Sequence, residues 1–324
     1  MIPALLHSLS FLHGGGRRIA FCFYLDGPDP GSLAVLRAAA ARMPGTMHIE
    51  VGDEHPEPNA GRARRAAMAF GSCILGTGQG LLFSTDADSL PAPDWITAGA
   101  AALEVADVVA GKIVRSDGHK DRDQTRMERY LDRLYAYRRR LDPVPWEAAD
   151  THHFAGGANM AIRSGVYHAL GGFRPLPIAE DATLLDDAAR AGFRVRRDAT
   201  MIVETSSRRD GRVVNGLASA LRSLDEGRVP YVAHPEGVAW QARAQASARG
   251  VFGVVDDAQV GETLGGIIGL TGDHILGVAR DCPNAEAFAM RVVPAAPMAG
   301  QRVTIEHAEA ALSALEAEPC RAAA

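Results

Sequence analysis

Two aspartates, Asp86 and Asp88, follow an apolar, strand-like segment in the stretch FSTDADSLPAPDWI (residues 83–96). Carboxylates two residues apart on an extended segment share one face and repel each other. A fold that places such a pair at a strand end commonly supplies a cation, and Mg²⁺ or Mn²⁺ prefer carboxylate and phosphate oxygens. The pair therefore predicts a site for a divalent cation and a phosphate group. The alternative is a solvated loop before the helix that Pro91 and Pro93 open.

A second acidic pair, Glu180-Asp181, begins the segment EDATLLDDAARAGFRV. Acidic residues in the first turn of a helix are favoured by the helix dipole, so a capping role is one interpretation. The other is catalytic, because a carboxylate that points into a pocket can take a proton from a hydroxyl group as that hydroxyl attacks.

A basic segment, Ser206 to Arg212, contains Arg208 and Arg209 next to a glycine. Arginines in such a turn can hold a diphosphate through charge-assisted hydrogen bonds. A solvated basic loop is an equally good interpretation.

Two adjacent histidines, His152 and His153, form a further candidate motif. Neighbouring side chains on a strand point to opposite faces, so the pair is a poor metal site. We expect ordinary core or surface histidines here.

The elements that must position these residues alternate between strand and helix. The apolar run IAFCFYL ends at Asp26, and Ser32 is placed to cap the helix that follows. Further elements are expected as strands at 47–51, 80–84, 111–114, 193–197 and 199–203 and as helices at 62–73, 121–140, 182–191 and 306–317. This order predicts an α/β fold with a mostly parallel sheet flanked by helices. Ligands in such sheets bind beyond the carboxyl ends of the strands, where Asp26, Asp86 and Asp88 are expected.

Composition narrows the class of protein. The chain has 324 residues and a net charge of -5, so no basic excess favours nucleic acid. No apolar run is long enough for a transmembrane helix, although peripheral membrane contact stays open. The first residues predict an amphipathic helix that ends at Gly14 rather than a signal peptide. Four widely spaced cysteines without a CxxC motif favour a reduced, cytoplasmic setting.

The order FSTDADSLPAPDWI, HHFAGGANMAIRSGVYHALGGF and AEDATLLDDAARAGFRV resembles family-2 glycosyltransferases of the GT-A fold. The resemblance covers roughly residues 3–225. It implies a GT-A-like (Rossmann-like nucleotide-binding) domain over residues 1–230. The remaining residues, 231–324, are expected to form a small, mainly helical extension of unknown function.

The resemblance also implies roles for single residues. Asp86 and Asp88 would lie at the diphosphate of a nucleotide sugar, with Asp88 the metal ligand in preference to Asp86, and Asp181, next to Glu180, would be the catalytic base. The remaining expected donor-site or cleft residues are Asp26, Arg62, Arg65, Gly156, Gly157, Asn159, Arg208 and Arg209.

The implied reaction is metal-dependent transfer of a hexosyl group, with inversion, from a nucleoside-diphosphate sugar to an acceptor hydroxyl. Mn²⁺ or Mg²⁺ would be the cofactor and a UDP-sugar the default donor. No motif in the sequence identifies the acceptor. Two alternatives stay open: a catalytically degenerate nucleotide-binding relic and a nucleotidyltransferase.

The chain departs from the family pattern at its start. The segment MIPALLHSLSFL looks like the helix that follows the usual first strand, so we expect that strand to be missing, through a misassigned start, a truncation or degeneration. The Q-x-x-R-W motif of processive synthases is also absent, which argues against polysaccharide synthesis of that type.

Overall fold

The computed structural model describes residues 1–77, 79–116, 122–209 and 217–318. The strands are β1 (Ala20–Leu25), β2 (Thr46–Val51), β3 (Leu81–Ser84), β4 (Ser89–Pro91), β5 (Val108–Arg115), β6 (Met160–Arg163), β7 (Val195–Thr205), β8 (Tyr231–Ala233) and β9 (Arg302–Thr304). The α-helices are α1 (Ile2–Leu9), α2 (Pro30–Ala39), α3 (Ala60–Leu75), α4 (Trp95–Val105), α5 (Arg122–Leu141), α6 (Ser164–Ala169), α7 (Glu180–Arg190), α8 (Leu217–Asp225), α9 (Pro235–Val251), α10 (Ala258–Ile268), α11 (Gly272–Arg280), α12 (Ala285–Val292) and α13 (Ile305–Ala317). Two 3₁₀ turns, η1 (Ala40–Arg42) and η2 (Phe252–Val254), complete them.

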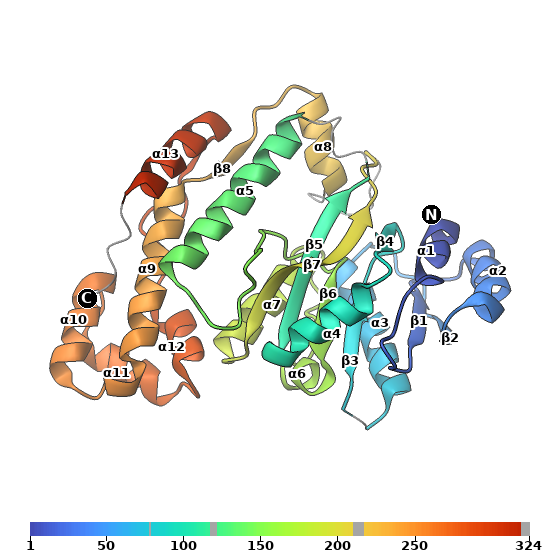
Figure 1. Ribbon diagram of the computed structural model, residues 1–324, viewed down its shortest axis with the longest axis horizontal. Coiled ribbons are helices and arrows are strands. Elements are labelled where there is room, and N and C mark those ends of the chain that lie inside the picture. The colour runs from blue at the N-terminus through green and yellow to red at the C-terminus, as the bar shows by residue number, and fades with distance from the viewer. Residues whose placement is uncertain (78, 117–121, 210–216, 319–324) are drawn as a thin grey trace.

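The fold is α/β, as predicted, with helices flanking a central five-stranded sheet of order β3-β6-β5-β7-β4 (Figure 1). The expectation of a mostly parallel sheet is wrong for this sheet. Only β5 and β7 are parallel there, and β6 and β4 pair antiparallel with their neighbours. The first three residues of β6 are fully buried and apolar, and such a run has the same pattern in either strand direction, so the sequence left the direction open.

A second, separate sheet consists of β1 and β2, which run parallel. Within the described residues, β1 and β3 are not hydrogen-bonded to each other, although both lie under α3. A Cβ atom on Gly71 of α3 would lie 3.9 Å from Cys22 of β1 and 4.0 Å from Leu82 of β3. In the described part of the chain, the sheet is thus interrupted between β1 and β3.

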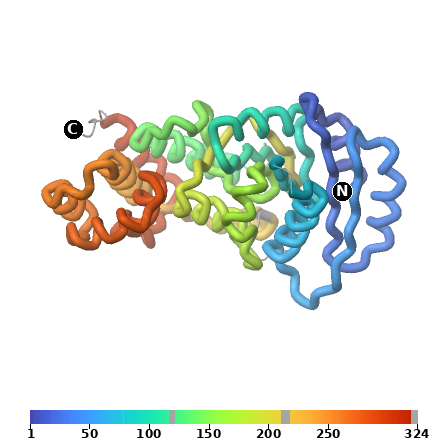
Figure 2. Tube along the Cα trace, turned by 90° about the horizontal axis from the view of Figure 1, so that it is seen from below, coloured from blue at the N-terminus to red at the C-terminus, as the bar shows by residue number. Residues whose placement is uncertain are grey.

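The C-terminal helices pack at the opposite end of the molecule from β1 and β2 (Figure 2). Tyr130, Leu134 and Tyr137 of α5 form one hydrophobic cluster with residues of β8, α9 and α13. β8 pairs with β9, which joins the two ends of this region. Residues 231–318 consist mainly of helices, and α5 and α7 are the elements to which these helices attach.

Some local predictions need correction. Helix α2 begins at Pro30 and is capped by Asp29, not by Ser32, because the Asp29 carboxylate accepts hydrogen bonds from the Ser32 backbone N–H (2.9 Å) and hydroxyl (2.5 Å). The two strands expected at 193–203 form one strand, β7, with an irregular register against β5. In the described part of the chain, no helix is both long and apolar enough to cross a membrane.

Candidate functional site

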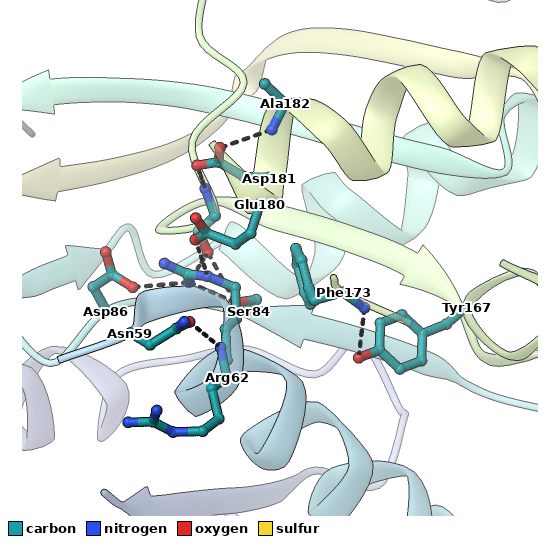
Figure 3. Close-up of polar contacts among 11 residues, drawn as sticks. Asn59, Arg62, Ser84, Asp86, Tyr167, Phe173, Glu180, Asp181 and Ala182 are labelled. Atoms are coloured by element: carbon teal, nitrogen blue, oxygen red, sulfur yellow. Dashed lines mark hydrogen bonds and ion pairs between the residues drawn. The ribbon is translucent and has the colours of Figure 1, made fainter. Parts of the chain in front are cut away.

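The centre of the candidate site is a largely buried arginine, Arg64, whose side chain is 12% exposed and which no sequence pattern singled out. Its Nη1 donates to Asp86 Oδ1 (2.8 Å), to Ser84 Oγ (3.1 Å) and to the Gly157 carbonyl (2.7 Å), while its Nε donates to Glu180 Oε1 (3.0 Å). Figure 3 shows Ser84, Asp86 and Glu180 pointing towards one another from three segments of the chain, with the dashed contacts of this network between them. One guanidinium therefore joins the two acidic motifs to the segment that contains Gly156 and Gly157, called the glycine segment below. These three parts of the chain are distant in sequence.

Helix α3 positions Arg64 because its first turn is fixed on both sides. Asn59 caps the helix by accepting from the Arg62 backbone N–H (2.8 Å), and its side-chain amide donates to the Pro175 carbonyl (3.1 Å). The Gly61 N–H donates to the Leu176 carbonyl (3.0 Å). A Cβ on Gly61 would collide with this 174–176 backbone, so only glycine permits the close approach. The start of α3 is thus held against the segment that leads into α7.

The two carboxylates at the start of α7 have different surroundings. The Glu180 side chain is buried in its ion pair with Arg64; burial raises the pKa of this carboxyl, and the Arg64 charge opposes that shift. Asp181 is half-buried, and its Oδ2 accepts from the Gly157 N–H (2.7 Å). Ala179 has φ 59°, a left-handed conformation that alanine rarely adopts. This strained residue sets the direction in which α7 presents both carboxylates.

The Asp86-Ala87-Asp88 turn follows β3, and each aspartate meets an arginine. Asp88 Oδ2 lies 2.9 Å from Arg208 Nη2, so the basic segment after β7 does reach the aspartate pair. Burial and then the neighbouring Asp86 charge raise the pKa of Asp88, while Arg208 lowers it. These are carboxylates close enough to repel each other, as the spacing predicted.

The donor set at this turn suits a divalent cation only in part. Among the residues that the structure describes, no group of three or more His, Cys, Asp or Glu side chains could hold a metal ion. Two carboxylates nevertheless fit Mg²⁺ or Mn²⁺ when phosphate oxygens and water complete the shell, as these ions prefer. Asp86 and Asp88 are the residues that would supply the carboxylate oxygens.

Asp26 and Arg62 meet beyond the end of β1. Their side chains are 3.7 Å apart, and Tyr24 lies close enough to Asp26 that the aspartate raises its pKa, after a larger contribution from burial. The Arg62 Nη2 also donates to the Glu57 carbonyl (3.0 Å). Asp26 and Arg62, both expected among the donor-site residues, are therefore together at the start of the helix that carries Arg64.

Three expected site residues have other positions. Arg65 donates to the Phe173 carbonyl (2.7 Å) and so holds the turn after α6. Arg209 pairs with Asp225 of α8 (2.9 Å), so Arg208 is the arginine at Asp88. Asn159 does not line a cleft, because it is fully buried. Its side chain bonds Trp95, the Lys112 carbonyl and the Met201 carbonyl, each at 2.8 Å.

Gly156 and Gly157 lie where bulk is excluded. A Cβ on Gly157 would collide with the Arg64 guanidinium, and one on Gly156 would collide with Ile113. The two glycines thus permit Ile113 and Arg64 to approach this backbone closely. Residues 210–212 of the basic segment lie outside the described residues.

The two adjacent histidines have separate surroundings. His153 Nδ1 lies 2.7 Å from Asp132 Oδ1. His152 is fully buried, and burial followed by the Arg197 charge lowers its pKa to about 4.

No protein-family profile and no curated protein matches this sequence. Among solved structures, the chain is similar to a mannosyltransferase from Pyrobaculum calidifontis in complex with GDP-Man and Mn²⁺, with 15% identity and a TM-score of 0.46 over 98% of this chain and 72% of that one. It is also similar to residues 1–349 of S. aureus TarS in complex with UDP, with 12% identity and a TM-score of 0.44 over 90% of this chain and 86% of that one. Similarity at this level carries no argument about the substrate or metal of this chain.

Proposed function

We propose that the protein is a glycosyltransferase that moves a sugar from a nucleoside-diphosphate sugar to an acceptor hydroxyl. The observation that carries the proposal is the Arg64 network. It brings the aspartate turn after β3 to the first turn of α7, so a diphosphate-binding group and a candidate base lie side by side. The sequence motifs of the GT-A family, in their family order, support the same assignment.

The leaving group in this reaction is a diphosphate, whose negative charge grows as the bond to the sugar breaks. Arg208, which pairs with Asp88, is close enough to the aspartate turn to offset that charge. A divalent cation held by Asp86 and Asp88 would add electrostatic stabilisation of the same charge. Asp26 and Arg62 would bind the nucleoside, with uridine as the default base.

Asp181 is the proposed catalytic base. Its carboxylate takes the proton of the acceptor hydroxyl, whose oxygen forms the new bond to the anomeric carbon. The bond from that carbon to the diphosphate breaks, and the diphosphate leaves with the electron pair. A single displacement of this kind inverts the configuration. Glu180 does not act as a base here; it holds Arg64, and through it the Gly157 carbonyl, in place.

The Asp181→Asn variant tests the base. Transfer should fall by at least about 100-fold, the usual contribution of a general base, while donor binding stays within a few-fold of the unsubstituted chain. Glu104→Gln, at an exposed position of α4, is the control for the loss of one negative charge. Equal losses of donor binding and turnover would mean that Asp181 is not the base.

A thermal-shift panel with UDP, GDP and TDP, each with and without Mn²⁺, tests the donor class. A ligand at 100 times its Kd stabilises by about 2.7 kcal/mol, a shift of a few degrees for a chain of this size. We expect a metal-dependent shift with one nucleotide and its loss in Asp88→Ala. A cooperatively melting protein that responds to no nucleotide would contradict the proposal and favour a relic. Release of pyrophosphate from the donor would identify a nucleotidyltransferase.

A further inference from the structure

A cavity of about 290 Å³ lies on the side of α7 where the C-terminal helices attach. Its walls come from α5, the 142–155 loop, α7, β7, α9 and α12, and Figure 1 shows α5 running alongside α9. Two wall residues are chain neighbours of the candidate site, since Ala182 follows Asp181 and Ala155 precedes Gly156. The cavity therefore lies next to the proposed base.

Three arginines of the cavity wall, Arg138, Arg139 and Arg197, have no ion-pair partner within the described residues. The Nε atoms of Arg139 and Arg197 are buried, and no described group accepts a hydrogen bond from them. Arg197 lies over the Tyr135 ring at 5.0 Å, and Arg138 approaches the same ring at 5.9 Å. Buried donors without acceptors are costly and normally have a partner.

The acidic residues of the same wall interact with groups other than Arg138, Arg139 and the Arg197 side chain. Asp142 and Glu286 both pair with Arg249, and Asp186 pairs with Arg190. Glu147 accepts hydrogen bonds from the backbone N–H groups of Arg197 (2.7 Å) and Ala148 (3.3 Å). The cavity thus presents guanidinium groups that form no ion pair with a described wall carboxylate.

The electrostatics favour an added anion. Burial lowers the pKa of Arg197, and although Tyr135 and Glu147 oppose this shift, the nearby charge of Arg138 adds to it. The like charges of Arg138 and Arg197 repel each other in a partly desolvated cavity, and an anion between them would offset the repulsion. Arginine forks match the oxygens of a phosphate group in charge and geometry.

We propose that this cavity binds the phosphate group of the acceptor, so that the acceptor is a phosphorylated alcohol whose hydroxyl reaches Asp181. The identification of the anion as the acceptor phosphate rests on the proposed function. The presence of an anion site in the cavity does not depend on it. It also gives residues 231–324 a role, because Arg249 of α9 and Glu286 and Met290 of α12 close the cavity.

Calorimetric titration with glycerol 3-phosphate, and with glycerol as the uncharged control, tests the site. The protein is first saturated with Mg²⁺ and the nucleotide that the thermal-shift panel identifies, so that the probe cannot occupy the diphosphate site. If no nucleotide binds, the Arg208→Gln chain is titrated instead. We expect glycerol 3-phosphate to bind and glycerol not to bind.

Arg197→Gln and Arg139→Gln should each weaken binding of glycerol 3-phosphate by about tenfold or more, the usual loss for a charge-assisted hydrogen bond. Arg133→Gln is the matched control: it removes one charge from α5, but Arg133 pairs with Glu316 of α13, outside the cavity. It should leave binding unchanged. If Arg197→Gln fails to fold, binding of glycerol 3-phosphate is measured in Arg139→Gln and Arg197→Lys instead. The lysine variant should retain part of the affinity.

The outcomes separate the two proposals. Absence of binding, binding of glycerol equal to that of its phosphate, or equal loss in Arg133→Gln overturns the anion site, even when donor binding is normal. Binding that needs Arg139 and Arg197 in a protein that binds no nucleotide supports the anion site and contradicts the glycosyltransferase proposal alone.

Discussion

At the scale of single residues, the site depends on one buried cation with two anionic partners. Arg64 neutralises Glu180, whose side chain is only 5% exposed, and Asp86, whose side chain is 41% exposed. A buried ion pair adds little net stability, but loss of one partner leaves the other charged and desolvated. The stability of the site and its geometry therefore depend on the same guanidinium.

Arg64→Ala should lower the free energy of unfolding by about 3 kcal/mol, because it leaves the Glu180 carboxylate buried without a partner. Glu180→Gln in the Arg64→Ala background should recover part of this loss, since it removes the unpaired charge. Urea unfolding of both variants provides the measurement. A double variant no more stable than Arg64→Ala would show that the cost arises from lost packing rather than from charge.

His152 should make stability depend on pH. Its pKa of about 4 in the folded chain lies below the ordinary value of about 6.5, so the unfolded chain binds the proton more tightly. Stability should fall as pH drops from about 6.5 towards 4, by up to about 3 kcal/mol from this residue.

The His152→Asn variant isolates that contribution. Asparagine can accept the Phe154 N–H bond that His152 Nδ1 accepts at 3.1 Å, but it does not titrate. Unfolding curves at several pH values between about 7 and about 4 should show a smaller fall for the variant than for the unsubstituted chain. Equal falls would assign the pH dependence to the carboxylates alone.

At the scale of elements, the start of α7 combines strain with function. Ala179 adopts a left-handed conformation directly before Glu180 and Asp181. Such strain at a helix start persists because α3, the glycine segment and α7 are bonded together around it.

Ala179→Gly should stabilise the protein by about 0.5–1 kcal/mol, because glycine adopts positive φ without steric cost. The control is the same exchange at Ala101, an exposed residue within α4. Helical geometry favours alanine there, so Ala101→Gly should cost about 0.5–1 kcal/mol. Urea unfolding measures both changes.

Two results would decide what the strain does. If Ala179→Gly destabilises the chain, the left-handed conformation carries no strain. A gain in stability with a loss of transfer would show that the strain positions Asp181.

At the scale of the whole molecule, Arg249 connects regions that are far apart in sequence. It lies on α9 and pairs with Asp142, at the end of α5, and with Glu286 of α12 at 2.6 Å. Both carboxylates are nearly buried. The attachment of the C-terminal helices therefore includes a charged link at the wall of the arginine-lined cavity.

Arg249→Met should lower the free energy of unfolding at neutral pH by about 3–5 kcal/mol, because it leaves two buried carboxylates unpaired. Arg243→Met is the control, on the same helix, where Arg243 donates a hydrogen bond to the Tyr137 hydroxyl (3.1 Å). Urea unfolding measures both variants, and a loss in Arg243→Met as large as that in Arg249→Met would contradict the charge argument.

Local patterns in the sequence determined a large part of this protein. The apolar runs located β1, β2, β3, β5 and β7, and the residues after them located Asp26, Asp86 and Asp88 at strand ends, because burial periodicity and turn chemistry act over a few neighbouring residues. The strands β4, β6, β8 and β9 were not among the expected elements. The same locality explains the errors. Asp29 and Ser32 are both good caps, and only the position of Pro30 as the first helical residue separates them.

Only the tertiary structure decided which groups meet. Arg62, Arg64 and Arg65 are neighbours on one helix, and the docking of α3 turned Arg64 towards Glu180, 116 residues away, and Arg65 towards Phe173. The direction of β6, the interruption between β1 and β3 and the arginine-lined cavity likewise depend on contacts between distant segments. The sequence by itself determined the chemical groups and their local conformation; the packing of whole elements determined their partners, because that packing depends on the shape and charge of many surfaces at once.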